Sequence, residues 1–205
     1  MPMNNQQRKI NSKEKIVSES LKLFSIKGFN NTSINDILDA VAMSKGGFYN
    51  HFKSKEELFT AVLSEARRVW RIHNLADLEK VNRHIDKLKK MLMNYKDRYL
   101  KDAIHFPGGC VFITLSVELD DQLPNLSSQL SDGFRKMKKM IKKFLDRARE
   151  QGEIRSDVST ANTSEILFSG ILGASVVYGM DKSESQLDKN IKALINYLES
   201  IEQRT

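Results

Sequence analysis

The segment TSINDILDAVAMSKGGFYNHFKSKEEL, residues 32–58, contains two short helical patterns with room for only a tight turn between them. The first pattern begins at Ser33 and Asp36, which have capping-box spacing, where a hydroxyl and a carboxylate satisfy the first N–H groups of a helix. An apolar stripe follows at helical spacing, formed by Ile34, Ile37, Leu38 and Val41. Ser44 can cap the second helix. We therefore expect two helices that meet at a sharp bend, with one face of the first in a core.

The first turn of the second helix contains Lys45, Gly46 and Gly47. Each glycine costs about 1 kcal/mol relative to alanine inside a helix, so we expect both to serve close approach to another surface. A helix with a small leading end can enter the DNA major groove, where a long cation reaches the edge of a guanine. These residues favour a DNA-docking helix-turn-helix, with Lys45 as the leading candidate for a base contact.

The residues after this turn divide into inward and outward groups. Phe48 and Phe52 are four positions apart and should pack inward. The outward positions carry donors that suit phosphates: Tyr49, His51 and Lys53. Ser54 and Glu57 form a second capping-box spacing, so a further helix should begin there with Lys55 in its first turn, where free N–H groups favour an anion.

The order SKGGFYNHFKSKEEL resembles the signature of the tetracycline-repressor (TetR) type of bacterial transcriptional regulators, and the likeness extends back through TSINDI to Phe24, Gly28 and Phe29. It covers roughly the first 60 positions of the chain. Two positions depart from the pattern: Ala42 stands where the turn usually has glycine, and Gly47 where many members have a small hydroxyl side chain. Spacing and resemblance together give the candidate DNA-binding residues Thr32, Ser33, Ser44, Lys45, Gly46, Gly47, Tyr49, Asn50, His51, Lys53 and Lys55.

Nearly every other segment also has helical periodicity, and only three prolines interrupt the 205 residues, so we expect an all-α protein. A first helix over residues 12–27 would complete a three-helix helix-turn-helix DNA-binding domain, residues 1–55. The resemblance implies that residues 56–205 form a larger α-helical ligand-binding and dimerisation domain. Its expected helices begin near residue 55 and cover about 77–101, 110–119, the stretch after Pro124, 160–179 and the stretch after Ser183.

The last two of these helices carry the candidate dimerisation residues Leu167, Gly170, Ile171, Ala174, Val177, Ile191, Leu194 and Leu198. The apolar pattern alone fits equally well a core buried inside one chain. The resemblance favours the alternative, in which both helices pair with their copies in a four-helix dimer interface. Two recognition helices could then lie about 34 Å apart in successive major grooves and read a pseudo-palindrome.

The resemblance also implies that a small molecule enters the larger domain and alters the separation of the two DNA-reading heads. Candidate ligand-binding residues are Trp70, Met91, Tyr95, Cys110, Phe112, Phe168 and Tyr178, although such side chains at helical spacing are also ordinary core residues. Cys110 follows two glycines at an expected helix N-terminus, where the helix dipole promotes thiolate chemistry. It is a candidate sensor of oxidants or electrophiles, with an inert buried cysteine as the alternative.

The net charge of +7 and a pI near 9.4 favour an anionic partner, but the cations are spread along the chain. The stretch 134–149 alone holds eight Lys or Arg against one acid. We interpret this run as a solvated helix face, with contact to DNA or another acidic partner as the alternative.

Several functional classes are disfavoured by what the sequence lacks. One cysteine excludes an intramolecular disulfide, and the four histidines have no metal-ligand spacing, so we expect neither a metal nor a cofactor. No phosphate-binding loop or nucleophile elbow is present, which argues against an enzyme. A polar N-terminus and the lack of 18 consecutive apolar residues favour the cytoplasm, with no membrane partner.

We therefore expect a ligand-responsive, homodimeric DNA-binding transcriptional regulator. It would be a repressor that binds a pseudo-palindromic operator and is released by a small-molecule inducer. The alternative is an interaction or nucleoid-associated protein that uses the same fold without an inducer.

Overall fold

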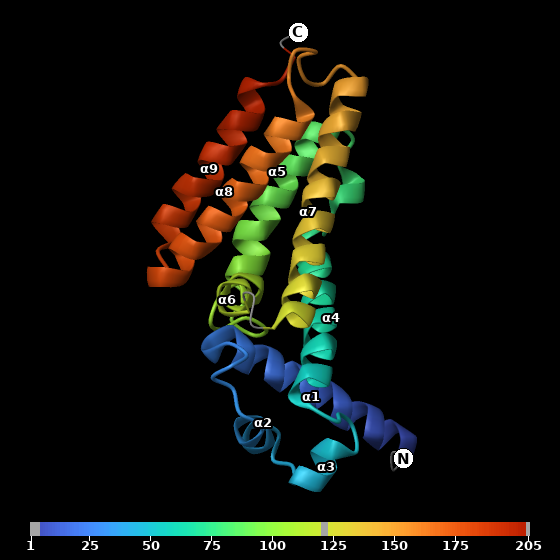
Figure 1. The fold of residues 1–205 in the computed structure, drawn as a ribbon. Helices are drawn as coiled ribbons and strands as arrows, with labels where there is room; N and C mark the ends of the chain where they lie inside the picture. Colours follow the sequence, from blue (N-terminus) through green and yellow to red (C-terminus); the bar gives the residue numbers. More distant parts are fainter. Residues whose placement is uncertain (1–4, 120–122, 204–205) are drawn as a thin grey trace. The chain divides into compact units, whose positions relative to one another are not determined.

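The computed structural model describes residues 5–119 and 123–203, and regular structure in these residues is helical apart from one isolated bridge between Ile154 and Glu202 (Figure 1). The α-helices are α1 (Asn5–Lys27), α2 (Ile34–Val41), α3 (Lys45–Tyr49), α4 (Lys55–Asn74), α5 (His84–Asn94), α6 (Val111–Glu118), α7 (Pro124–Glu150), α8 (Thr160–Asp181) and α9 (Glu184–Ser200). A 3-10 turn, η1 (Leu78–Lys80), precedes α5, and a π-helical segment, η2 (Tyr95–Leu100), follows it. The expectation of an all-α protein is confirmed.

The described residues divide into two compact units. The first contains the chain up to Val69 together with the segment from Asp102 to Ser127, and the second contains Trp70–Lys101 and the chain from Ser128 onward. The expected domain boundary, between residues 55 and 56, lies at the first residues of α4. The structural boundary lies within α4 instead, and residues 102–127, which the sequence placed in the larger domain, belong to the first unit.

An aromatic cluster forms the core of the first unit. The ring of Phe29 meets those of Phe24 and Phe59 edge to face, with centroids 5.6 and 5.4 Å apart, and all three side chains are buried. Gly28 follows α1 with a φ of +78°, a left-handed C-cap conformation that glycine adopts without strain. This conformation turns the chain from α1 toward α2.

Gly108 joins the 102–127 segment to α1. Its N–H donates to the hydroxyl of Ser25 over 3.2 Å, and a Cβ at this position would lie only 1.8 Å from the Ser25 carbonyl oxygen. The two backbones therefore touch at a point where only glycine fits. Together with the packing of α6 on α1, this contact explains why the segment belongs to the first unit.

In the second unit, α8 packs on α9, and α5 also packs on α9 (Figure 1). The buried apolar residues of α8 and α9 include Leu167, Ile171, Ala174, Leu187, Ile191 and Leu198. By length and composition alone α8 could cross a membrane, but the core helix of a soluble protein passes the same test. Its packing on α9 is the arrangement expected of such a core helix.

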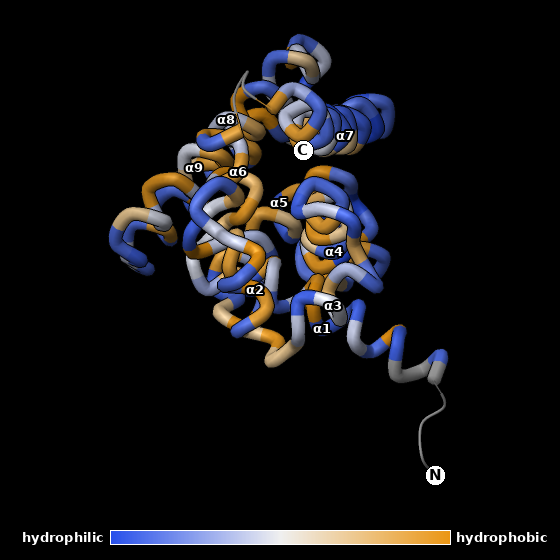
Figure 2. Tube along the Cα trace, turned by 60° about the horizontal axis from the view of Figure 1, so that its bottom comes forward, coloured by the Kyte–Doolittle hydropathy of each residue, from blue (hydrophilic) through white to orange (hydrophobic). Residues whose placement is uncertain are grey.

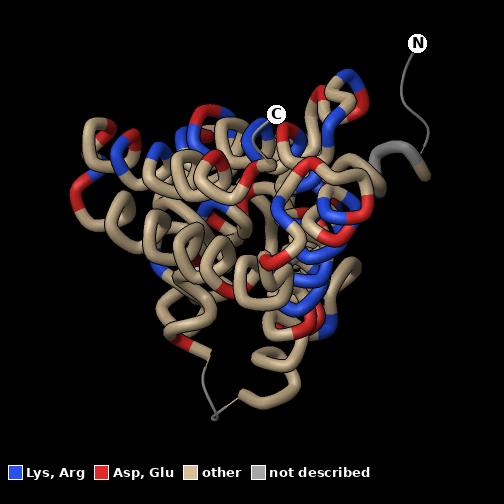
Figure 3. Tube along the Cα trace, turned by 90° about the horizontal axis from the view of Figure 1, so that it is seen from above, with Lys and Arg blue, Asp and Glu red and all other residues tan. Residues whose placement is uncertain are grey.

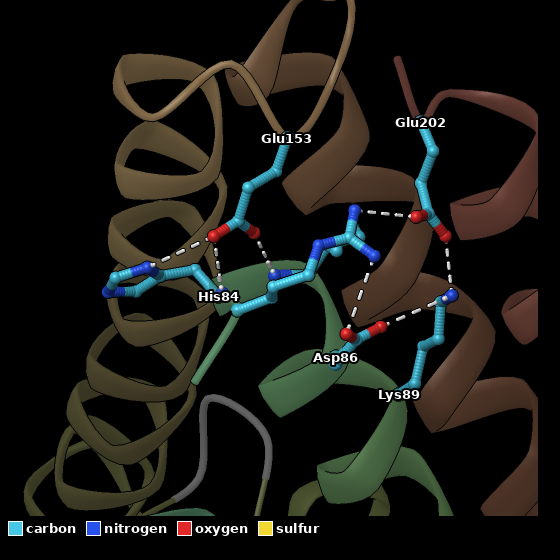
Figure 4. A network of polar contacts seen from close by, with 7 residues as sticks. His84, Asp86, Lys89, Glu153 and Glu202 are labelled. Carbon is cyan, nitrogen blue, oxygen red and sulfur yellow. Dashed lines mark hydrogen bonds and ion pairs between the residues drawn. The ribbon is translucent and has the colours of Figure 1, made fainter. Parts of the chain in front are cut away.

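A buried carboxylate defines where α5 begins (Figure 4). Glu153 accepts hydrogen bonds from the backbone N–H groups of His84 and Ile85, over 2.9 and 2.8 Å. These N–H groups lie in the first turn of α5 and have no partner within the helix. The sequence predicts one long helix over 77–101, whereas in the structure α5 begins only at His84. The residue that caps this start, Glu153, lies 69 positions further along the chain, so helical periodicity could not show it.

Next to this cap, Glu202 accepts hydrogen bonds from Arg83 and Lys89, and both cations also contact Asp86 (Figure 4). Burial by itself raises the pKa of Glu202, but the hydrogen bonds and charges of Lys89 and Arg83 act against it, and the net effect is a lowered pKa. This network ties the segment after α9 to the start of α5.

Candidate DNA-binding surface

Helix α2 is closed at both ends by local hydrogen bonds. Ser33 Oγ accepts from the N–H of Asp36 over 3.0 Å, and the Asp36 carboxylate accepts from the N–H of Ser33 over 2.7 Å, so the predicted capping box is confirmed. Ala42 follows α2 in the left-handed conformation, with φ 53°. This is the position where the resemblance favours glycine, and a Cβ there carries a conformational cost that glycine would avoid. The bend between α2 and α3 nevertheless forms.

The leading end of α3 lies at the surface of the first unit. Ser44 caps it by accepting from the N–H of Gly47 over 3.2 Å. Lys45 and Gly46 are exposed, and among the described residues a Cβ at Gly46 would meet nothing within 4 Å beyond its chain neighbours and its own helix backbone. The chain's own packing therefore does not require glycine at position 46.

The inward and outward positions after the bend agree in part with those expected from the sequence. Phe48 and Phe52 are buried, as predicted, whereas 43% of Tyr49 is exposed. Ser33, Ser44, Asn50 and Lys53 are also exposed, and Gly47, His51 and Lys55 are half-buried.

The side chain of Thr32, one of the predicted DNA-binding residues, does not reach the surface of the chain. Its exposed fraction is 0%, and its hydroxyl donates to the carbonyl of Gly28 over 2.6 Å. Lys55 is also engaged within the chain: its ammonium donates to the carbonyls of Phe29 and Thr32, over 2.9 and 3.0 Å. Burial lowers the pKa of Lys55. Both residues hold the turn between α1 and α2.

Two further cations lie near the candidate surface. Lys9 and Lys13 of α1 are exposed, and their charges act with burial to lower the pKa of His51, with burial as the largest cause. The Lys13 ammonium lies 5.2 Å from the centroid of the Phe52 ring. Sequence reasoning missed these lysines because their four-residue spacing shows that they share a helix face but not which element that face adjoins.

Asp36 links the capping box to α1. Its carboxylate accepts from Lys27 over 2.7 Å, and this hydrogen bond, followed by those from the side chain and backbone of Ser33, holds its pKa far below the usual value of 3.8. Because the folded-state pKa is depressed, the stabilisation is present above pH 3.8 and is lost as the pH falls toward the folded-state pKa.

Asp36→Asn is therefore expected to lower the melting temperature at pH 7 and to flatten its dependence on pH below about 4. Thermal unfolding followed by circular dichroism between pH 2.5 and 7 measures both effects. Asp39→Asn, an exposed position on the same helix, is the matched control. Parallel pH profiles for the wild type and Asp36→Asn would contradict the linkage.

Two family models match the chain. Residues 16–62 match the model described as bacterial regulatory proteins, tetR family, and residues 84–194 match the tetracyclin repressor-like C-terminal domain. The chain belongs to the TetR family. It is a helix-turn-helix transcriptional regulator and not an enzyme.

Known TetR-type proteins resemble the chain over much of its length. A helix-turn-helix regulator encoded in the lacX 3' region of Lactococcus lactis is 36% identical over 127 residues, which cover 62% of this chain and 60% of that protein. IcaR of Staphylococcus aureus, a negative regulator of the biofilm operon icaADBC, is 25% identical over 90% of this chain and 97% of its own. A TetR regulator from Chloroflexus aurantiacus has the same fold, with a TM-score of 0.88 and 24% identity over 97% of this chain and all of that chain.

The candidate ligand-binding residues of this TetR-family chain do not all share one unit. Trp70, Met91, Tyr95, Phe168 and Tyr178 belong to the second unit, whereas Cys110 and Phe112 belong to the first. The hydroxyls of Tyr95 and Ser175 are 2.5 Å apart and buried. Cys110 stands at the N-cap of α6, as predicted, and is buried.

The candidate dimerisation residues require a correction. Leu167, Ile171, Ala174, Ile191 and Leu198 are buried inside the chain's own core, Gly170 packs against Leu194, and only Val177 among the eight is exposed. The opposite side of α8 carries the exposed apolar residues Ile166, Val176, Val177 and Met180. Because α8 is apolar on both sides, its periodicity could not show which side faces the core.

Proposed function

We propose that this TetR-family protein is a homodimeric repressor that binds a pseudo-palindromic operator and is released by a small-molecule inducer. The observation that carries the proposal is the open space at Gly46. Glycine inside a helix costs about 1 kcal/mol relative to alanine. Apart from its chain neighbours and the backbone of its own helix, no described group lies within 4 Å of a Cβ placed there, so the space at this glycine is open to close approach of DNA.

The groups around Gly46 divide the task of DNA recognition. Lys45 has an exposed side chain at the leading end of α3, where a cation can reach the O6 and N7 atoms of guanine. Ser33, Ser44, Tyr49, Asn50 and Lys53 offer exposed donors, and Lys9 and Lys13 add cationic groups for the phosphates. His51, whose pKa is lowered by burial and by these two lysines, can offer a neutral imidazole N–H. Base edges would supply specificity, and phosphates would supply position.

The lysine run of α7 is not part of the surface that we propose for DNA. Figure 2 shows that hydrophilic residues occupy most of α7, and Figure 3 shows acidic residues interspersed among the basic ones along the helices. Lys136 pairs with Asp132 over 2.6 Å, and Lys142 pairs with Asp146 over 2.8 Å. These pairs favour the solvated-face interpretation of the run.

The exposed side of α8 is the surface that we propose for dimerisation. Ile166, Val176, Val177 and Met180 recur along it at helical spacing, with Gly173 between them, and 81% of Met180 is exposed. A Cβ at Gly173 would meet nothing within 4 Å, so a second copy of α8 can approach the backbone closely. Two copies related by a two-fold axis would present two α3 helices to successive major grooves.

The double variant Val177→Glu, Met180→Glu is expected to be monomeric, because a dimer would bury four carboxylates against apolar groups. Sedimentation velocity measures the change in mass, and operator binding should weaken by about tenfold or more because each half-site must then bind alone. Ile104→Glu, at an exposed apolar position in the first unit, is the control and should stay dimeric. A double variant that remains dimeric would overturn the assignment of this surface.

Selection of genomic DNA fragments with the purified protein tests the function as a whole. A repressor should enrich fragments that share one short palindrome, whereas a nucleoid-associated or interaction protein should enrich no common sequence. Adding cell metabolites to the bound complex and measuring release of DNA then tests the inducer. We place this activity in the cytoplasm, where the DNA of a bacterium lies.

A further inference from the structure

Glu118, the last residue of α6, reaches the turn that follows α1. Its carboxylate accepts hydrogen bonds from the backbone N–H groups of Phe29 and Asn30, over 2.5 and 2.7 Å. Two successive N–H groups that point at one carboxylate form an anion-binding turn. A Cβ at Gly28 would lie 2.4 Å from Glu118 Oε2, so glycine at this position lets the carboxylate approach.

Lys55 binds two carbonyl groups of the same turn. Its ammonium donates to the carbonyls of Phe29 and Thr32, and it lies 4.3 Å from the centroid of the buried Phe29 ring. The charge of Glu118 counteracts the lowering of the Lys55 pKa by burial. An acid and a base, one from α6 and the other from α4, therefore hold the turn between them.

We propose that Glu118 is a positioning residue for DNA recognition, which fixes the turn between α1 and α2 and thereby the direction in which α2 and α3 leave it. The turn runs directly into Ser33, the N-cap of α2, and α2 leads through the Ala42 bend into α3. A change of direction at the turn is thus carried to Lys45. The inference rests on the proposed function, since it assumes that α3 reads DNA.

Loss of the positioning contact and the change in net charge predict different effects on DNA binding when Glu118 is replaced. Removing a carboxylate raises the net charge from +7 to +8, which by itself favours binding to any DNA. Loss of the positioning contact instead weakens binding to the operator, where α3 must align with base edges. The two effects have opposite signs.

The test compares Glu118→Gln with Glu150→Gln in the full-length protein. Glu150 is an exposed glutamate of α7, paired with Arg147, so its replacement makes the same change in net charge but removes no hydrogen bond to the turn. Affinities are measured for the selected operator and for a random duplex. Glu118→Gln should weaken operator binding by about fivefold or more, the scale of a typical coupling between sites, without weakening binding to the random duplex. Glu150→Gln should weaken neither.

The amide signals of Phe29 and Asn30 provide a readout that does not depend on DNA. Loss of a charge-assisted hydrogen bond should move both amide proton resonances upfield and speed their exchange with solvent in Glu118→Gln but not in Glu150→Gln. The melting temperature establishes that each variant is folded at the temperature of the binding assay.

Each outcome bears on the inference. Wild-type protein that selects no common sequence would overturn the proposed function and this inference with it. If the wild type selects a shared palindrome and Glu118→Gln binds that operator as tightly as the wild type does, only the role of Glu118 is overturned. Unchanged amide signals of Phe29 and Asn30 in Glu118→Gln would also overturn the role of Glu118.

Discussion

Lys45→Ala is expected to weaken binding to the operator by about 1 to 3 kcal/mol, the scale of a good contact between a side chain and a base. The side chain of Lys45 is exposed at the first residue of α3, and no hydrogen bond or ion pair to it is present among the described residues. Alanine also favours a helix, so the fold should not suffer. Fluorescence anisotropy with operator duplexes that differ at one base pair locates the position that Lys45 reads.

Lys53→Ala is the matched comparison, because Lys53 is exposed after α3 and is proposed to contact phosphate. Its replacement should weaken binding to all sequences evenly and reduce the salt dependence by about one counterion. Lys45→Ala should instead reduce discrimination between the operator and its single-base variants. If Lys45→Ala lowered affinity equally for every duplex, its assignment as a base-reading residue would be rejected.

The parts of the surface that the sequence predicted depend on neighbouring residues. The Ser33 and Asp36 box, the Ser44 cap and the inward positions of Phe48 and Phe52 follow from spacings of three or four residues. Such interactions form within one or two helical turns, so the order of residues determines them. The sharp bend between the two helices was also expected from spacing, and the structure places Ala42 in the left-handed conformation within it.

The parts that the sequence missed depend on contacts between distant segments. Thr32 is an exception, because it is buried and its hydroxyl donates to the carbonyl of Gly28, only four positions away. Glu118 reaches Phe29 across 89 positions, and Glu153 reaches His84 across 69. Periodicity shows which residues share a face of a helix but not which other helix that face meets. The same limit explains why the periodicity of α8 did not show which of its sides is buried within the chain.

Gly108→Ala is expected to destabilise the first unit by about 3 kcal/mol or more, at the upper end of the cost of overpacking. Its Cβ would lie 1.8 Å from the carbonyl oxygen of Ser25 and 2.7 Å from the Cα of Ile26. Both atoms belong to the backbone of α1, so no side chain can rotate away to make room. The segment must separate from α1, which would also break the hydrogen bond between Gly108 and Ser25. Thermal and urea unfolding measure the loss.

Gly46→Ala is the matched control, since it adds the same methyl group where nothing lies within 4 Å. It should leave the free energy of unfolding unchanged or raise it by up to about 1 kcal/mol, because alanine favours the helix. The methyl group should nevertheless weaken operator binding, because it occupies the space that DNA is proposed to fill. Equal stability of Gly108→Ala and Gly46→Ala would show that the 102–127 segment yields without cost and would contradict the contact with α1. Full operator affinity in Gly46→Ala would remove the argument that this glycine exists for DNA.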